Sequence, residues 1–89
     1  MTYDIESVTK MGNIVNLTIR ATNLNEQTIE SGDTLFTLSS DVIPVGTIKM
    51  FANVNGSVVN CTVSNLGAVS VGSAIAQNET VAIVLTYSV

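Results

Sequence analysis

The sequence predicts an all-β protein, either a small antiparallel β-sandwich or a Greek-key or jelly-roll-like barrel of six to seven short strands. Along most of the chain, apolar and polar side chains alternate with the period of a strand, and no segment has a helical period. Val, Ile, Thr, Ser and Asn dominate, and these residues favour strands and turns. Turn signals recur about every ten residues. We therefore expect residues 1–89 to form one β-domain.

The first two strands are expected on either side of a turn at residues 10–13, "KMGN". Residues 3–9 precede this turn, and residues 13–21, "NIVNLTIRA", follow it with strict alternation. Four alternate side chains share an apolar face that we expect in the core: Val15, Leu17, Ile19 and Ala21. The polar segment that follows, residues 21–32, is long enough to cross from one sheet to another.

The middle of the chain is predicted to contain a short strand at residues 34–38. Turn-forming residues bound it at positions 30–33 and 41–46. Pro44 has no N–H group to donate to a sheet ladder, so it belongs in the connection or at a sheet edge.

The next strands form two hairpins. Residues 47–54 alternate, and Asn55 and Gly56 follow as the strongest short hairpin signal, because both tolerate a positive φ. Within residues 57–71, Gly67 stands where a three-residue or bulged hairpin needs the left-handed conformation. These signals predict a three-stranded meander.

The last strand is predicted at residues 81–89 with one inward face, formed by Val81, Ile83, Leu85, Tyr87 and Val89. Ala82 and Val84 make part of its opposite face apolar as well. Either a neighbouring subunit or a loop of the same chain is expected to cover that second face.

No catalytic, metal or cofactor site is predicted. The sequence has no histidine, so the usual general base at neutral pH is absent. Cys61 shares a strand face with Val59 and Val63, as a buried structural cysteine does, and a single thiol excludes a structural zinc. Asp33 and Asp41 match no calcium-loop spacing. We expect a protein that is not an enzyme.

Charge and composition point to protein partners. The net charge is −4 and the three basic residues, Lys10, Arg20 and Lys49, are scattered, which argues against nucleic acid. No apolar run approaches the ~20 residues that span a bilayer. Yet 46% of the residues are hydrophobic and only 11% are charged. We expect part of the surface to be hidden in a homo-oligomer.

A saccharide is the one ligand for which the sequence offers a candidate site. Phe51 lies on the strand face that also carries Asn53, and Asn55 follows in the turn. An aromatic ring with nearby amides is the arrangement that sugars need, so these three residues are the predicted ligand-binding set. The competing interpretation places Phe51 in a core or an interface.

Two stretches, "GDTLFTLSSDVIPVGTI" and "NGSVVNCTVSNLGAVSV", together resemble a small β-domain found at the C-terminal ends of phage tail, baseplate and fibre proteins. That family often has a "LFTLP" strand and a "G-Y-R-P" turn. The matching residues are Gly32, Leu35, Phe36, Leu38, Pro44, Val63, Gly67 and Val69. Ser39 replaces the first proline, and residues 41–43 replace Gly-Tyr-Arg.

The resemblance implies a virion component, commonly a trimer, that assembles with other virion proteins and faces outward in the host-attachment apparatus. It assigns no binding residues. Two alternatives stay open: a monomeric carbohydrate-binding module, and a structural domain of a bacterial surface assembly.

Overall fold

The computed structural model describes the backbone of residues 2–89 and the side chains of Thr2 and residues 4–89. In this part of the chain, one antiparallel sheet contains seven strands in the spatial order β1-β2-β7-β4-β5-β6-β3. The strands are β1 (Thr2–Met11), β2 (Ile14–Thr22), β3 (Phe36–Thr37), β4 (Ile48–Val54), β5 (Ser57–Val63), β6 (Ala68–Val71) and β7 (Thr80–Ser88). The predicted all-β fold is confirmed.

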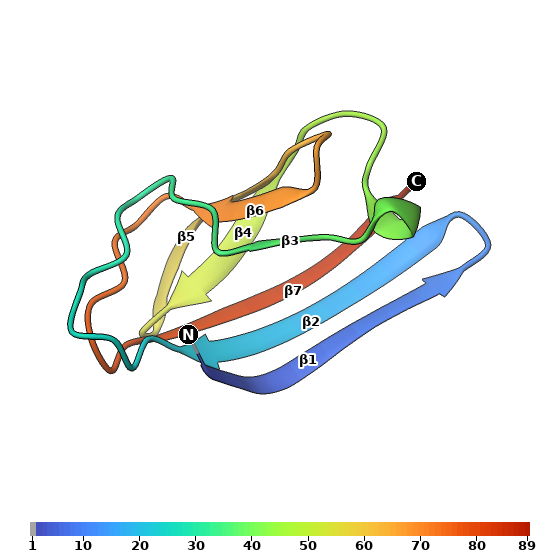
Figure 1. Ribbon diagram of the computed structural model, residues 1–89. Helices are drawn as coiled ribbons and strands as arrows, with labels where there is room; N and C mark the ends of the chain where they lie inside the picture. The colour runs from blue at the N-terminus through green and yellow to red at the C-terminus, as the bar shows by residue number, and fades with distance from the viewer. Residues whose placement is uncertain (1) are drawn as a thin grey trace.

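The sheet curls into a half-barrel with two layers (Figure 1). The layers meet at β7 and β4, which stay paired over a short length only. β2 and β7 pair over their full length, from Ile14–Ser88 to Thr22–Thr80. β7 and β4 pair only through Asn53–Ala82 and Val54–Val81. As a result β1, β2 and β7 form one layer, and β4, β5, β6 and β3 form the other. β4, β5 and β6 make a meander and β7 returns beside β4, which is a Greek key.

The core lies between the layers and is built from the inward positions that alternation predicts. Every predicted inward residue of β2 is buried, and so are Val81, Ile83, Leu85 and Tyr87 of β7. Val89, the fifth residue of the predicted inward face, follows β7 and is only partly buried. The opposite layer contributes the smaller side chains of β4, β5 and β6. Its buried members are Ala52, Val54, Cys61, Val63, Val69 and Val71.

Both predicted hairpin turns are present. Asn55 and Gly56 have φ values of 50° and 90°, as the two central residues of a type I′ turn require. Gly67 has φ +88°, and a Cβ atom there would lie 3.0 Å from the side chain of Ile43. Glycine is therefore needed at position 67 for its conformation and for its close packing.

One end of the half-barrel is closed by two long connections, residues 23–35 and 72–79. The first crosses from β2 to β3, as its length predicts, and Ile29 forms an isolated bridge with Ile75. Asn23, the buried polar residue of the core region, joins them. Its Nδ2 donates to the backbone oxygens of Gln27 and Ile75, each at 3.0 Å, and its Oδ1 accepts from the Asn25 N–H.

The other end is covered by the short 3-10 helix η1 (Ser40–Val42). Val42 is buried, and the Tyr87 hydroxyl donates to its carbonyl oxygen at 2.7 Å. Pro44 is buried in the connection that leads to β4, where it needs no ladder partner. Residues 2–89 contain no helix long and apolar enough to cross a membrane.

The two edges of the sheet differ from the simple expectation. β3 has only two ladder residues where the sequence predicts a strand at 34–38, although Leu35 and Leu38 still donate to the carbonyl oxygens of Val69 and Gly67. β1 pairs with β2 along its whole length, with a bulge between Tyr3 and Ile5, yet all its described side chains are exposed. Asp4 and Glu6 are exposed, and so is the apolar Ile5 between them.

Candidate functional site

The β4–β5 turn is a rigid structure that is fixed to β7. Asn53 Oδ1 accepts a 2.8 Å hydrogen bond from the Gly56 N–H, and the Asn55 N–H donates to the Thr80 carbonyl oxygen at 2.8 Å. The type I′ turn also fixes the backbone angles of Asn55 and Gly56. The side chain of Asn53 and the backbone of Asn55 are therefore held beside the first residues of β7.

A surface depression of about 370 Å³ lies next to this turn, on the outer face of the sheet. Its lining residues are Arg20, Asn53, Asn55, Gly56, Thr80 and Ala82. Three of them form one cross-strand row, because Arg20 of β2 pairs with Ala82 of β7, and Ala82 pairs with Asn53 of β4. Ala82 has only a methyl group between two longer side chains, which leaves the space in the row empty.

The lining is rich in hydrogen-bond donors and contains no carboxylate. Arg20 supplies a guanidinium, the two asparagines supply amides, and Thr80 supplies a hydroxyl that lies 3.2 Å from the Thr22 hydroxyl. Among the residues that the structure describes, Arg20 has neither an ion pair within 4.0 Å nor a side-chain hydrogen bond. The depression thus carries a positive charge with no internal partner.

The structure brings together two of the three residues predicted to bind a ligand. Asn53 and Asn55 line the depression. Phe51 does not, but it lies two residues earlier on the same outer face of β4 and is 69% exposed. Burial of Phe51 in the core of this chain is thus wrong, and contact of the three residues with a ligand stays a prediction.

Sequence reasoning missed Arg20, Thr80 and Ala82. Alternation along β2 does place Arg20 on the outer face, so its exposure could have been inferred from the sequence. Its position beside Asn53 could not, because it depends on the register between β2, β7 and β4, which come from distant parts of the chain.

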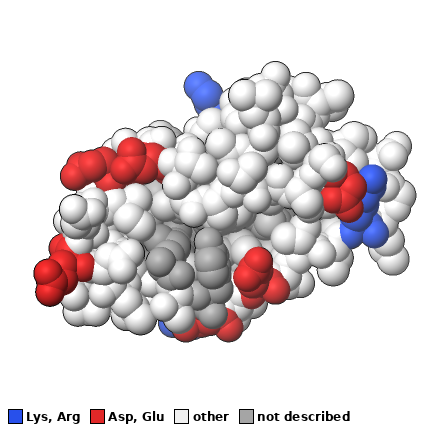
Figure 2. Space-filling model, viewed as in Figure 1, with Lys and Arg blue, Asp and Glu red and all other residues white. Residues whose placement is uncertain are grey.

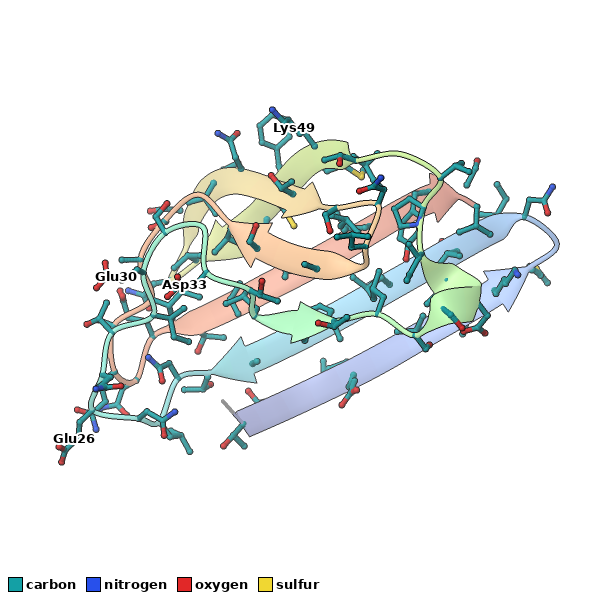
Figure 3. The ribbon with its side chains drawn as sticks, turned by 45° about the horizontal axis from the view of Figure 1, so that its top comes forward. Glu26, Glu30, Asp33 and Lys49 are labelled. Atoms are coloured by element: carbon teal, nitrogen blue, oxygen red, sulfur yellow. The ribbon has the colours of Figure 1, made fainter. Side chains whose placement is uncertain are left out.

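The residues with potential for catalysis or metal binding are dispersed. Cys61 is 1% exposed, and burial raises the pKa of its thiol to about 11, so it is neutral and inaccessible at physiological pH. No group of three His, Cys, Asp or Glu side chains is close enough to hold a metal ion within the described part of the chain. Glu30 and Asp33 lie together only because they share a turn, and Glu26 lies apart from them (Figure 3).

A second, smaller cavity of about 220 Å³ marks the seam, which is the gap between the two edges of the curled sheet. Glu6 and Val8 of β1 line one side, with Ile19 of β2 behind them, and Phe36 and Leu38 line the other. The two edge strands do not pair across this gap, so the barrel is open there.

The outer face of the β1–β2–β7 layer carries large apolar side chains in solvent. Val84 is 69% and Met11 80% exposed, and Ile5 and Ile14 are exposed as well. Arg20 is the only charged residue among the outward positions of β2 and β7. Charged groups are also sparse on the face that Figure 2 shows, where they lie mainly around the margin of the view.

No protein-family model matches the chain, and a search of curated proteins finds no sequence that matches it.

Proposed function

We propose that the protein is a non-enzymatic virion domain of a phage tail, baseplate or fibre, which assembles with copies of itself and takes part in attachment to the host surface. Two independent lines support this proposal. The first is the resemblance carried by residues 32–75. The second is the outer face of the β1–β2–β7 layer, whose character suits burial against another copy.

The outer face is the observation that carries the assembly part. The contact between copies is proposed for the part of this face that carries no charge, and the end with Arg20 and Ala82 is left open. The outward residues of the uncharged part on β2 and β7 are Ile14, Asn16, Thr18, Val84, Thr86 and Ser88. Burying Lys or Glu in an interface has a large desolvation cost, whereas aliphatic and hydroxyl groups are buried at much lower cost. The cores of protein interfaces are depleted in charged residues for this reason.

A second copy is the occupant that fits this surface best. The face has almost no charge to complement, so it has no electrostatic means of selecting a different partner. A trimer is the assembly that the resemblance favours, with the uncharged parts of three outer faces meeting around one axis. Other virion proteins would then contact the remaining surfaces, and the assembly would face the exterior.

The absence of enzymatic activity is supported by the chemistry of the described residues. The one thiol is buried with a raised pKa, and there is no histidine to act as a base.

Light scattering of the purified protein tests the assembly. The expected mass is three times the 9.3 kDa of one chain. Val84→Lys should shift the mass to that of one chain, because it places a charge in the proposed interface. Val58→Lys is the matched control: Val58 is 72% exposed on the outer face of β5, in the other layer, and its replacement should leave the mass unchanged.

A monomeric wild-type protein at high concentration would overturn the assembly, as would a Val84→Lys variant that stays oligomeric while it remains folded by circular dichroism. A monomer that still binds saccharide would favour the second candidate, a carbohydrate-binding module. The depression beside Asn53 and Asn55 is the observation that supports this second candidate.

A further inference from the structure

We propose that the depression lined by Arg20, Asn53, Asn55 and Thr80 binds a saccharide that carries a carboxylate, such as a uronic acid. The inference rests on the proposed role in attachment and names the chemical class of ligand that this surface would recognise. Its components are a cation without a partner, oriented amide donors, a space created by a small residue and an apolar rim.

Arg20 supplies the charge recognition. It lies on a strand that is paired on both sides, with Ile5 of β1 and Ala82 of β7, so its backbone is held firmly. The guanidinium has no ion pair or hydrogen bond with any described residue. A planar guanidinium presents two parallel N–H groups that match the two oxygens of a carboxylate. In a chain of net charge −4, such an unpaired cation is available to an anionic ligand.

The amides supply the recognition of hydroxyl groups. Because Asn53 Oδ1 is occupied by the Gly56 N–H, the amide is fixed and its two Nδ2 hydrogens are left for a ligand. The Asn55 side chain is exposed at the same rim, and its backbone is held by the bond to Thr80. One fixed amide, a second exposed amide and a hydroxyl suit sugar hydroxyls, which both donate and accept.

The space and its apolar rim fit a sugar ring. Ala82 leaves the row between Arg20 and Asn53 open, and the volume of about 370 Å³ is within the range of small-molecule sites. Neither Val58 nor Phe51 lines the depression, but Val58 pairs with Asn53 on the outer face and Phe51 lies two residues before Asn53 on that face. Both are about 70% exposed, and they offer carbon surface to the C–H face of a sugar.

The charge of the surroundings favours a single carboxylate over a phosphate. Asp4 at the β1 bulge lies close to the depression, with its Oδ2 3.4 Å from the Thr22 hydroxyl. Phosphate recognition by side chains draws on several cations, and this site has one. A singly charged ligand is therefore better matched than a doubly charged one.

Titration of the ¹⁵N-labelled protein by NMR tests the proposal with four probes. Glucuronate carries the ring and the charge, glucose the ring alone, acetate the charge alone, and inorganic phosphate a different charge. We expect glucuronate to shift the amide signals of the lining residues with a Kd on the order of 1 mM, and the other three to bind at least about tenfold more weakly.

Two variants remove the site in different ways. Arg20→Gln removes the charge with little change in size, and Ala82→Leu fills the space while it keeps the charge. Each should weaken glucuronate binding by about tenfold or more, because one removes charge-assisted hydrogen bonds and the other removes the room for the ring. Lys49→Gln is the control, since Lys49 on β4 is a cation that does not line the depression (Figure 3).

Three results would overturn the proposal: no shifts with glucuronate at about 100 times the expected Kd, equal binding of acetate or phosphate, or the same loss in Lys49→Gln as in Arg20→Gln. Light scattering on the same samples separates this failure from failure of the proposed function. A trimer that ignores glucuronate contradicts only the ligand class. A monomer that ignores every probe contradicts both.

Discussion

β1 and β7 are both long strands that pair with β2 over nine residue pairs, yet they differ in the burial of their side chains. Every inward residue of β7 is buried, whereas no described side chain of β1 is. The difference comes from the opposite layer, which covers β7 and ends before it reaches β1. Hydrogen bonding to a neighbour thus makes a strand, but only a covering layer gives it a share in the core.

The largest expected difference between the two strands concerns a core residue of β7. Leu85→Ala should lower the free energy of unfolding by about 2–5 kcal/mol, because it removes buried surface and leaves a cavity. Urea denaturation of the purified variant measures this loss. A loss below about 1 kcal/mol would mean that β7 is not the centre of the core.

The contact between the two long connections, residues 23–35 and 72–79, should be the next most sensitive element. Asn23→Ala removes three side-chain hydrogen bonds, one of them buried and two partly buried, and we expect a loss of about 2–3 kcal/mol in the same assay. Asn25→Ala is the control in the same loop, since its side chain is exposed, and it should have little effect. Equal effects of the two substitutions would contradict the role given to Asn23.

The interior also has a pH dependence, which comes from the thiol of Cys61. Burial raises the pKa of Cys61 from 9.0 to about 11, so between these values the unfolded chain loses a proton that the folded chain keeps. The contribution of the protonated thiol to the free energy of unfolding should therefore be complete below pH 9. It should fall as the pH rises toward 11, by up to about 1.4 kcal/mol per pH unit.

Urea denaturation at several pH values, with Cys61→Ala as the reference, isolates this contribution from the other groups that titrate there. A Cys61→Ala variant with the same pH dependence as the parent would show that the thiol contributes nothing.

The smallest effect is expected in β1. Val8→Ala should change the free energy of unfolding by no more than about 0.5 kcal/mol, because Val8 is 41% exposed and borders the open seam. A loss close to that of Leu85→Ala would mean that the seam is closed in solution and that β1 belongs to the core.

Local sequence signals predicted much of the fold because they act over a few residues. The alternation in 13–21 and 81–89 identified the inward faces, and Asn55-Gly56 identified a turn through its backbone preference. Asn23 gave no such signal, because one asparagine in a polar segment looks the same whether it is buried or solvated. Its role depends on Ile75, 52 residues away.

The candidate site was predicted in part for the same reason. Asn53 and Asn55 belong to a local hairpin, whereas Arg20 joins them only through the register of three strands. Side chains brought together by long-range pairing cannot be grouped from spacing along the chain.

The two residues of β3 have a consequence for how copies of this domain can aggregate. A filament built by strand addition needs two usable edges on each molecule, one to join the molecule before it and one to join the molecule after it. The ten residues of β1 offer a long edge, but β3 is too short to receive it. Strand addition can therefore join two copies through their β1 edges and then stops. This protects a weakly charged β-protein from open-ended polymerisation.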